Sequence, residues 1–168
     1  MLALKNILVA TDFSEGSAAA LTYGRALARQ FGARLHLLHA VETAGIDVAG
    51  VDTYVAAIPQ LRAEFEEQAR ATLEQTVTDA DRRDLHAVTA LRTLEAPARA
   101  IVAYAVEAAI DLIVIGTHGR RGVSHLVMGS VAEKVVRTAP CPVLTVRHPE
   151  REFVTPDAAT TADARTAR

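Results

Sequence analysis

The sequence predicts an α/β protein in which a parallel sheet is covered by helices. The run Leu112–Ile115 is short, β-branched and ends at Gly116, which is typical of a strand buried on both faces. A second apolar run, Ile7–Ala10, ends at a turn in the same way. Amphipathic stretches, with apolar residues every three or four positions, lie between the strand candidates. Because strands and helices alternate, the connections are expected to be right-handed crossovers between parallel strands.

The composition fits one domain with a packed core. The chain has 168 residues, of which 50% are hydrophobic, and a formal net charge of -2. The basic residues are dispersed, so neither nucleic acid nor an anionic membrane is expected as a partner. No apolar run approaches the roughly 18–20 residues that span a bilayer. The N-terminus lacks a signal-peptide layout, and Cys141 alone cannot form an internal disulfide. These features predict a cytoplasmic protein.

The first half of the chain predicts two strands around one helix. Ile7–Ala10 is the first strand, and Ser14 is a candidate N-cap for a helix that runs to about Phe31. Gly32 is expected to stop that helix in the left-handed conformation. The second strand is predicted over Leu35–Val41. Residues 42 to 58 have no clear period. The residues expected to face inward on the first helix are Leu21, Gly24, Leu27, Ala28 and Phe31.

The second half continues the alternation. A long helix is predicted from Gln60 to about Arg83, followed by a strand over Val88–Leu94 and a helix with Pro97 in its first turn. After Leu112–Ile115, Gly129-Ser130 opens another helix, and Val143–Val146 is the fifth strand. The expected apolar faces of the three helices are Leu61, Phe65, Ala69, Leu73, Val77 and Ala80; Ile101, Val102, Ala105 and Ala109; and Val131, Val135, Val136 and Ala139. We predict one domain over 1–147 and a disordered polar tail over 148–168.

The connection after Leu112–Ile115 has the layout of a phosphate-binding unit. A buried strand, a glycine loop and a helix start follow one another, and the N–H groups at a helix start attract anions. The glycines let the backbone approach an anion, and Arg120 and Arg121 add donors. Two alternatives stay open: ordinary loop glycines with a solvated arginine face, and a helix start that merely carries a capping box from Ser130 to Glu133.

The spacing of these glycines resembles a known signature. Gly116, two residues, Gly119, nine residues and Gly129-Ser130 match the nucleotide-binding signature of the universal stress protein family. The stretches NILVATDFSEGSAAAL, LHLLHAVE and GSVAEKVVRTAPCPVLTVR resemble that family too, over roughly residues 4 to 147. The resemblance implies a Rossmann-like three-layer α/β/α fold with a five-stranded parallel sheet of order 3-2-1-4-5. In that order strands 1 and 4 are neighbours, and ligands bind where the connections diverge.

The resemblance also implies a ligand, ATP accompanied by Mg²⁺. The adenine is expected near Val41, the ribose near Asp12, and the phosphates along the glycine unit, with a backbone N–H from Val131. From the residues alone, Asp12 is equally a turn residue, and Val41 and Ile115 are equally core. The site residues implied are Ala10, Thr11, Asp12, Val41, Ile115, Gly116, His118, Gly119, Arg120, Gly129, Ser130 and Val131.

No catalytic or metal-binding set is expected. Gly129 is followed by Ser130-Val131 and not by the lysine of common phosphate loops, while His36 and His39 should face opposite sides of their strand. Cys141 is expected to be packed. The resemblance implies a homodimer, through the edge formed by Val143, Leu144, Thr145 and Val146, with further, unidentified protein partners. The alternatives are a dimeric interaction module without nucleotide, or a slow ATPase or self-phosphorylating enzyme.

Overall fold

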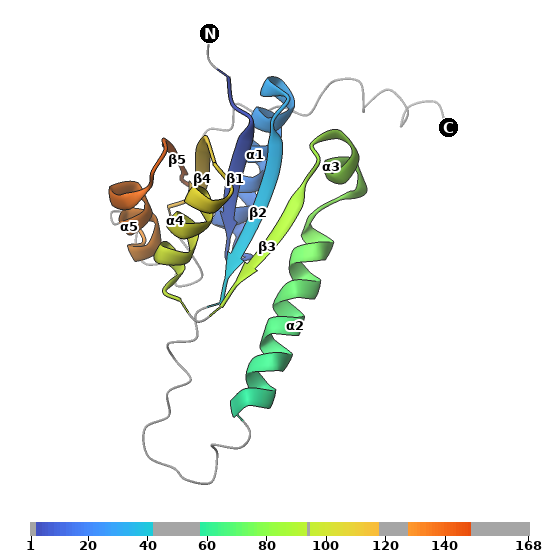
Figure 1. Cartoon of the computed structure of the whole chain (residues 1–168), viewed down its shortest axis with the longest axis vertical. Coiled ribbons are helices and arrows are strands. Elements are labelled where there is room, and N and C mark those ends of the chain that lie inside the picture. The colour runs from blue at the N-terminus through green and yellow to red at the C-terminus, as the bar shows by residue number, and fades with distance from the viewer. Residues whose placement is uncertain (1–2, 42–57, 94, 118–127, 149–168) are drawn as a thin grey trace.

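The computed structural model describes residues 3–41, 58–93, 95–117 and 128–148, and its strands form one parallel sheet (Figure 1). The strand order is β3-β2-β1-β4-β5, so the predicted fold class and order are confirmed. The strands are β1 (Asn6–Thr11), β2 (Arg34–Ala40), β3 (Val88–Arg92), β4 (Leu112–Gly116) and β5 (Val143–Val146). The helices are α1 (Glu15–Phe31), α2 (Ile58–Thr76), α3 (Asp79–Asp84), α4 (Pro97–Glu107) and α5 (Ser130–Thr138).

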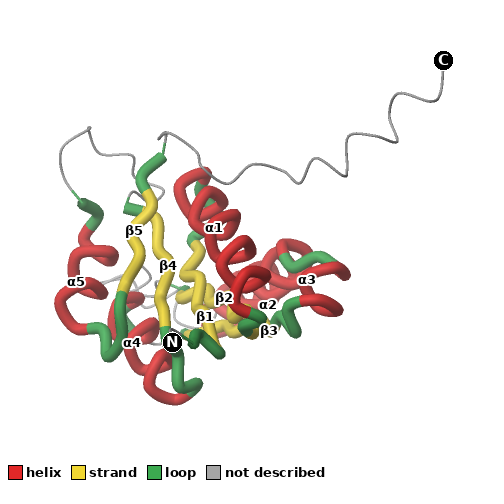
Figure 2. The backbone as a smooth tube through the Cα atoms, turned by 90° about the horizontal axis from the view of Figure 1, so that it is seen from above, coloured by secondary structure: helices red, strands yellow, loops and turns green. Residues whose placement is uncertain are grey.

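The helices cover both faces of the sheet, which gives the three layers expected. Figure 2 shows α1, α2 and α3 on one side of the strands and α4 and α5 on the other. Alternate residues of each strand enter two separate cores, as the period of two requires. Leu37 lies in the core beneath α1, and the neighbouring Leu38 lies in the core beneath α4 and α5. The central strands therefore read as continuous apolar runs because both of their faces are buried.

The predicted ends of the first helix are confirmed. Ser14 is the N-cap of α1, and its side chain accepts a hydrogen bond from the N–H of Ser17. Gly32 ends the helix at a φ of 62°, in the left-handed region that favours glycine. Because α1 runs antiparallel to the strands, its N-terminus lies at the carboxyl ends of the strands and Gly32 lies at the opposite edge.

The single long helix predicted from Gln60 to Arg83 is wrong, because the chain breaks between α2 and α3. Thr78 forms a capping box with Asp81 that starts a new helix. The side chain of Asp81 is 1% exposed, and Arg25 of α1 donates to it through Nε at 3.0 Å and Nη2 at 2.7 Å. A buried carboxylate that accepts these bonds fixes α3 against α1, and this long-range pairing overrides the helical period.

Smaller differences concern where elements end and which side chains they bury. β3 ends at Arg92 and not at Leu94, which lies outside the described residues. Ala109 adopts a φ of 48° beyond the end of α4 and is exposed, and the neighbouring Ile110 is buried instead. In α5 the buried residues are Ala132 and Val135, whereas Val136 is 47% exposed. The buried face of α5 is therefore rotated relative to the predicted face, toward Ala132 and away from Val136.

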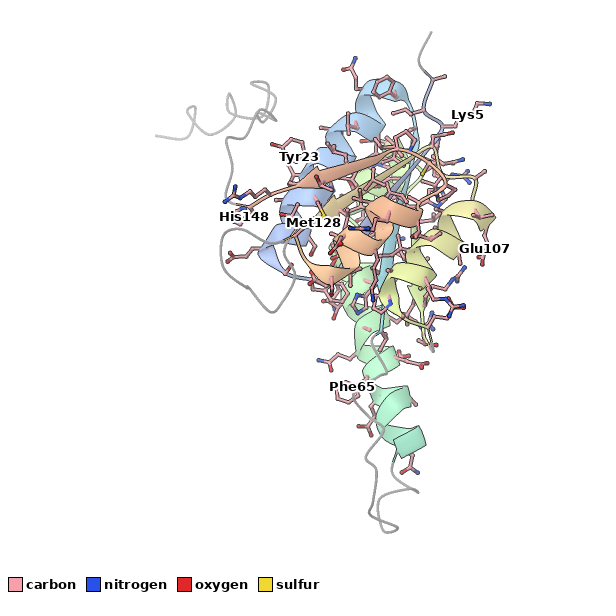
Figure 3. The ribbon with its side chains drawn as sticks, turned by 90° about the vertical axis from the view of Figure 1, so that its left-hand side faces the viewer. Lys5, Tyr23, Phe65, Glu107, Met128 and His148 are labelled. Atoms are coloured by element: carbon pink, nitrogen blue, oxygen red, sulfur yellow. The ribbon has the colours of Figure 1, made fainter. Side chains whose placement is uncertain are left out.

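The first half of α2 extends away from the sheet. Phe65 is 48% exposed, whereas Leu73, two turns further along the same face, is 1% exposed. Figure 3 shows Phe65 on the part of the helix that projects below the body of the molecule. Among the described residues, no helix is long and apolar enough to cross a membrane.

Candidate functional site

The candidate site lies where the two central strands end. β1 and β4 pair in parallel, with Ala10 opposite Ile115, so Thr11 and Gly116 terminate neighbouring strands. From β1 the chain continues through α1 to β2 on one side, and from β4 it continues through α5 to β5 on the other. This divergence is the topological switch point at which open α/β sheets bind ligands.

The turn after β1 is held by a dense set of hydrogen bonds. The Asp12 carboxylate accepts from the N–H of Ser14 at 3.1 Å and from its hydroxyl at 2.6 Å. Thr11 Oγ1 accepts from the N–H of Phe13 at 3.0 Å and lies 3.1 Å from the hydroxyl of Ser17. Phe13 has a φ of 65°, which is uncommon for a residue with a large side chain. These hydrogen bonds therefore order the turn, and Asp12 has a structural role as the acceptor for Ser14 in addition to any contact with a ligand.

Gly116 is required by packing at this edge. A Cβ at this position would lie 2.8 Å from the carbonyl oxygen of Gly16, in the first turn of α1. A backbone neighbour cannot rotate away, so a side chain at residue 116 would push α1 from the sheet. The glycine thus lets the first turn of α1 pack closely against the end of β4, whether or not it also contacts a ligand.

The two sides of the glycine-rich connection meet directly. The N–H of Gly129 donates to the carbonyl oxygen of Thr117 over 2.7 Å, and the N–H of Thr117 donates to Val146 over 2.8 Å. The first turn of α5 is consequently tied to the end of β4. The N–H of Glu133 donates to the carbonyl oxygen of Gly129, so the N–H groups of Ser130, Val131 and Ala132 precede the first intrahelical bond.

The predicted capping box at Ser130 is wrong. Gly129 is the N-cap residue and has no side chain to form a cap, and within the described residues Ser130 is an exposed first-turn residue rather than the cap. The hydrogen bond to Thr117 sets the helix start one residue earlier than the Ser130–Glu133 pattern indicates. A cap without a side chain leaves the N–H groups of the first turn approachable by an anion.

The end of β2 lies beside the turn after β1. His39 is the strand partner of Thr11, and Val41 follows two residues later, with its N–H bonded to the carbonyl oxygen of Arg92 at 2.8 Å. Val41 is partly buried. The structure thus brings Val41 to the edge of the sheet that also carries Thr11, Gly116 and Gly129.

Most, but not all, of the predicted site residues can be located. Ala10 and Ile115 are buried in the core beneath α4 and α5, below the ends of their strands. Three predicted site residues, His118, Gly119 and Arg120, lie outside the described residues, as does Arg121. The predicted residues that meet at the carboxyl edge are Thr11, Asp12, Val41, Gly116, Gly129, Ser130 and Val131.

The sequence interpretation missed His39. Its Nδ1 lies 2.7 Å from the carbonyl oxygen of Thr11, and its ring lies 4.4 Å from the ring of Phe13. From the sequence alone, this histidine is considered only as a possible metal ligand beside His36. The predicted separation is confirmed, since His36 contacts Tyr104 of α4 on the opposite face. The available signal was its position at the end of the second strand, beside the Thr11-Asp12 turn.

Cys141 has a packing role. Cys141 packs against the core beneath α4 and α5, and burial raises the pKa of its thiol, which disfavours the nucleophilic thiolate. Within 3–41, 58–93, 95–117 and 128–148, no three histidine, cysteine, aspartate or glutamate side chains gather in a way that could hold a metal ion.

Comparison with known proteins gives the family. The universal stress protein family model matches residues 3–147. The chain belongs to the universal stress protein family. A universal stress protein of Thermus aquaticus is 39% identical over 143 residues, which cover 85% of this chain and 98% of the relative.

Solved structures of the same family share the fold. The universal stress protein UspA from Lactobacillus plantarum superposes with a TM-score of 0.69 at 26% identity, over 88% of this chain and 100% of that one. A universal stress protein described as a complex with cAMP has a TM-score of 0.62 at 22% identity, over 87% and 98% of the two chains. A universal stress protein from Archaeoglobus fulgidus described as a complex with dAMP has a TM-score of 0.57 at 23% identity, over 87% and 99%. At these identities the last two comparisons establish the fold alone.

Proposed function

We propose that this universal stress protein binds an adenine nucleotide, with ATP as the expected ligand, at the edge where β1 and β4 end. One observation carries the proposal: the Thr117–Gly129 hydrogen bond brings the first turn of α5, whose N-cap is a glycine, to the switch point of the sheet. Three N–H groups there precede the first intrahelical bond, which suits a phosphate group. Two universal stress proteins of the same fold are described as complexes with cAMP and with dAMP, which supports an adenine nucleotide as the ligand class.

The residues at the edge suggest how the nucleotide would be held. The phosphates would accept from the N–H groups of Ser130 and Val131. The ribose hydroxyls would donate to the Asp12 carboxylate, and the adenine would pack near Val41 at the end of β2. Mg²⁺, if it accompanies ATP, would be held chiefly by phosphate oxygens and water, as is usual for this ion, because no metal-binding cluster occurs among the described side chains.

The proposed biological role is regulation of stress tolerance through partners. The family name implies the link to stress, and a homodimer is the first partner we propose. β5 is an edge strand, and no strand in the described part of the chain pairs with its open side. Its residues Val143, Leu144 and Thr145 are uncharged and only partly buried. An edge of this kind needs covering, and pairing with β5 of a second copy would cover it.

The nucleotide proposal can be tested on freshly purified protein. The chain has no tryptophan and three tyrosines, so bound adenine would dominate absorbance at 260 nm. Protein that has been heat-denatured would release the nucleotide for chromatography, and we expect ATP or ADP. If the protein is purified free of nucleotide, titration calorimetry with Mg-ATP measures whether it binds the nucleotide. Absence of any binding at millimolar Mg-ATP and at millimolar cAMP would refute the proposed function.

A further inference from the structure

A buried histidine contacts the turn after β1 on both sides of Asp12. His39 is 7% exposed. Its Nδ1 lies 2.7 Å from the carbonyl oxygen of Thr11, which precedes Asp12, and its ring packs at 4.4 Å against the ring of Phe13, which follows Asp12. Because a carbonyl oxygen only accepts, Nδ1 must carry the hydrogen, and this fixes the imidazole as a donor to the turn.

The turn needs such support because its backbone is strained. Phe13 has a φ of 65°, in the left-handed region where the Cβ of an L-residue crowds the following carbonyl oxygen. Strained residues persist where their surroundings over-determine them. Here the surroundings are the bond from the N–H of Phe13 to Thr11 Oγ1 and the imidazole of His39. Removal of the imidazole would therefore loosen the segment that carries the Asp12 carboxylate, although the bonds from Ser14 to Asp12 remain.

We propose that His39 is a positioning residue for the nucleotide site. Its imidazole holds Thr11 and Phe13 in place, and in this way sets the direction of the Asp12 carboxylate toward the ribose hydroxyls. The proposal rests on the proposed function, because the effect on affinity requires a nucleotide at this edge. The effect on the turn does not require one, and so the two can fail separately.

The same strand provides a matched control. His36 is also buried, at 6% exposure, and its Nδ1 is also hydrogen-bonded, at 2.9 Å from the Tyr104 hydroxyl. It lies on the opposite face of the sheet, against α4, and its Nε2 lies 3.4 Å from the amide oxygen of Asn6 at the start of β1, so both of its ring nitrogens are directed away from the turn. Replacing either histidine by leucine removes the hydrogen bonds of an imidazole ring that is mostly buried, but only the replacement of His39 removes a hydrogen bond to the turn.

The test compares three variants by calorimetric titration with Mg-ATP: His39→Leu, His39→Asn and His36→Leu. We expect His39→Leu to weaken binding about tenfold, as loss of one well-placed hydrogen bond predicts. His39→Asn keeps an N–H donor near the position of Nδ1 and should recover most of that loss. His36→Leu should leave the affinity within about twofold, although its thermal midpoint falls. Unchanged affinity in His39→Leu, or an equal loss in His36→Leu, would overturn the proposal.

A second readout on the same variants does not need the ligand. Hydrogen exchange of the Phe13 and Ser14 amides, followed by NMR, reports directly on the turn. We expect faster exchange at both amides in His39→Leu and no local change in His36→Leu. If the wild type binds no nucleotide, the proposed function fails, and these amides alone decide whether His39 holds the turn. Unchanged exchange in His39→Leu would overturn the positioning role in either case.

Discussion

The backbone N–H of Gly129 donates to the carbonyl oxygen of Thr117 over 2.7 Å, so the two sides of the glycine-rich connection are joined at the edge of the sheet. This bond defines where α5 begins and holds its first turn beside the end of β4. The same carbonyl oxygen would lie 3.0 Å from a Cβ at residue 129. The site thus depends on a close approach of two backbone segments.

Gly129→Ala should weaken nucleotide binding. The φ of Gly129 is -59°, which alanine adopts without strain, so the effect comes from the contact with Thr117. The carbonyl must move by a few tenths of an ångström, which we expect to lengthen the bond and shift the first turn of α5. We expect Mg-ATP affinity to fall about tenfold, which corresponds to the loss of roughly one hydrogen bond. Calorimetric titration measures the change.

Gly32→Ala is the matched control for that change. Gly32 has a φ of 62° with open space around its Cβ position, so alanine there costs about 1 kcal/mol of stability through the backbone alone. It lies at the opposite edge of the sheet and should leave affinity unchanged. If both variants lose affinity equally, general destabilisation and not the Thr117 contact is the cause.

Asp81→Asn should destabilise the protein strongly at neutral pH. Burial by itself would raise the pKa of Asp81, but the hydrogen bonds from Arg25 and Thr78 outweigh it and hold the pKa below its ordinary value. Breaking a buried pair costs about 3–5 kcal/mol. We expect the lower end, because 23% of the Arg25 side chain is exposed. Urea unfolding at pH 7 measures the change.

The pH dependence of this pair has a defined sign. Because the folded-state pKa is depressed, the stabilisation is present above the ordinary aspartate pKa of about 3.9 and is lost as the pH falls through the folded value. The gap between wild type and Asp81→Asn should narrow in acid. Glu74→Gln removes an exposed ion pair with Arg82 and should cost less than about 1 kcal/mol. A similar loss in both variants would contradict the importance of the buried pair.

His36 should make the protein less stable as the pH falls below about 6.5. Burial first, and the neighbouring Arg34 second, lower the pKa of His36. The unfolded chain therefore binds a proton between the ordinary and the folded pKa, which the folded protein does not bind, and stability rises with pH through that window. His36→Asn should make the thermal midpoint change less between pH 5 and pH 7 than it does in the wild type. If the thermal midpoint of the variant rises with pH as steeply as that of the wild type, groups other than His36 set the pH dependence.

Thr145→Pro should produce a folded monomer if the proposed dimer pairs through β5. The carbonyl oxygens of Pro142 and Val146 point to β4, where they accept from Ile113 and Thr117. By the alternation of strand hydrogen bonds, the N–H of Thr145 points to the open edge. Proline there removes an outward donor without removing a bond to β4.

Sedimentation of this variant beside Thr145→Val separates edge pairing from side-chain effects. Valine keeps the outward N–H and suits a strand, so we expect Thr145→Val to remain dimeric. Circular dichroism should confirm that the proline variant is folded. A monomeric wild type, or a proline variant that is still dimeric, would exclude pairing through this edge.

Local sequence signals predicted the sheet and the ends of α1 because those features depend on nearby residues. β-branched runs specify buried strands, and Ser14 and Gly32 satisfy the groups at the helix ends. The break at Thr78 also has a local signal, a threonine three residues before Asp81. The apolar period of the preceding helix continued through that signal and obscured it.

Other features depend on contacts between distant residues and left no local signal. The Ser130–Glu133 pattern indicated a capping box, but the bond between Thr117 and Gly129 places the cap one residue earlier. Phe13 has a left-handed conformation and packs against His39 from another strand. Most of the site's scaffold was therefore predictable, whereas the contacts that aim its side chains were not.

The central claim is that an adenine nucleotide binds where β1 and β4 end, and the most direct test is an amide NMR titration of the wild-type protein with Mg-ATP. We expect saturable shifts at the turn after β1, at Val41, at Gly116 and Thr117, and in the first turn of α5. Shifts confined to other parts of the sheet or to α2, or the absence of shifts at millimolar nucleotide, would contradict the account.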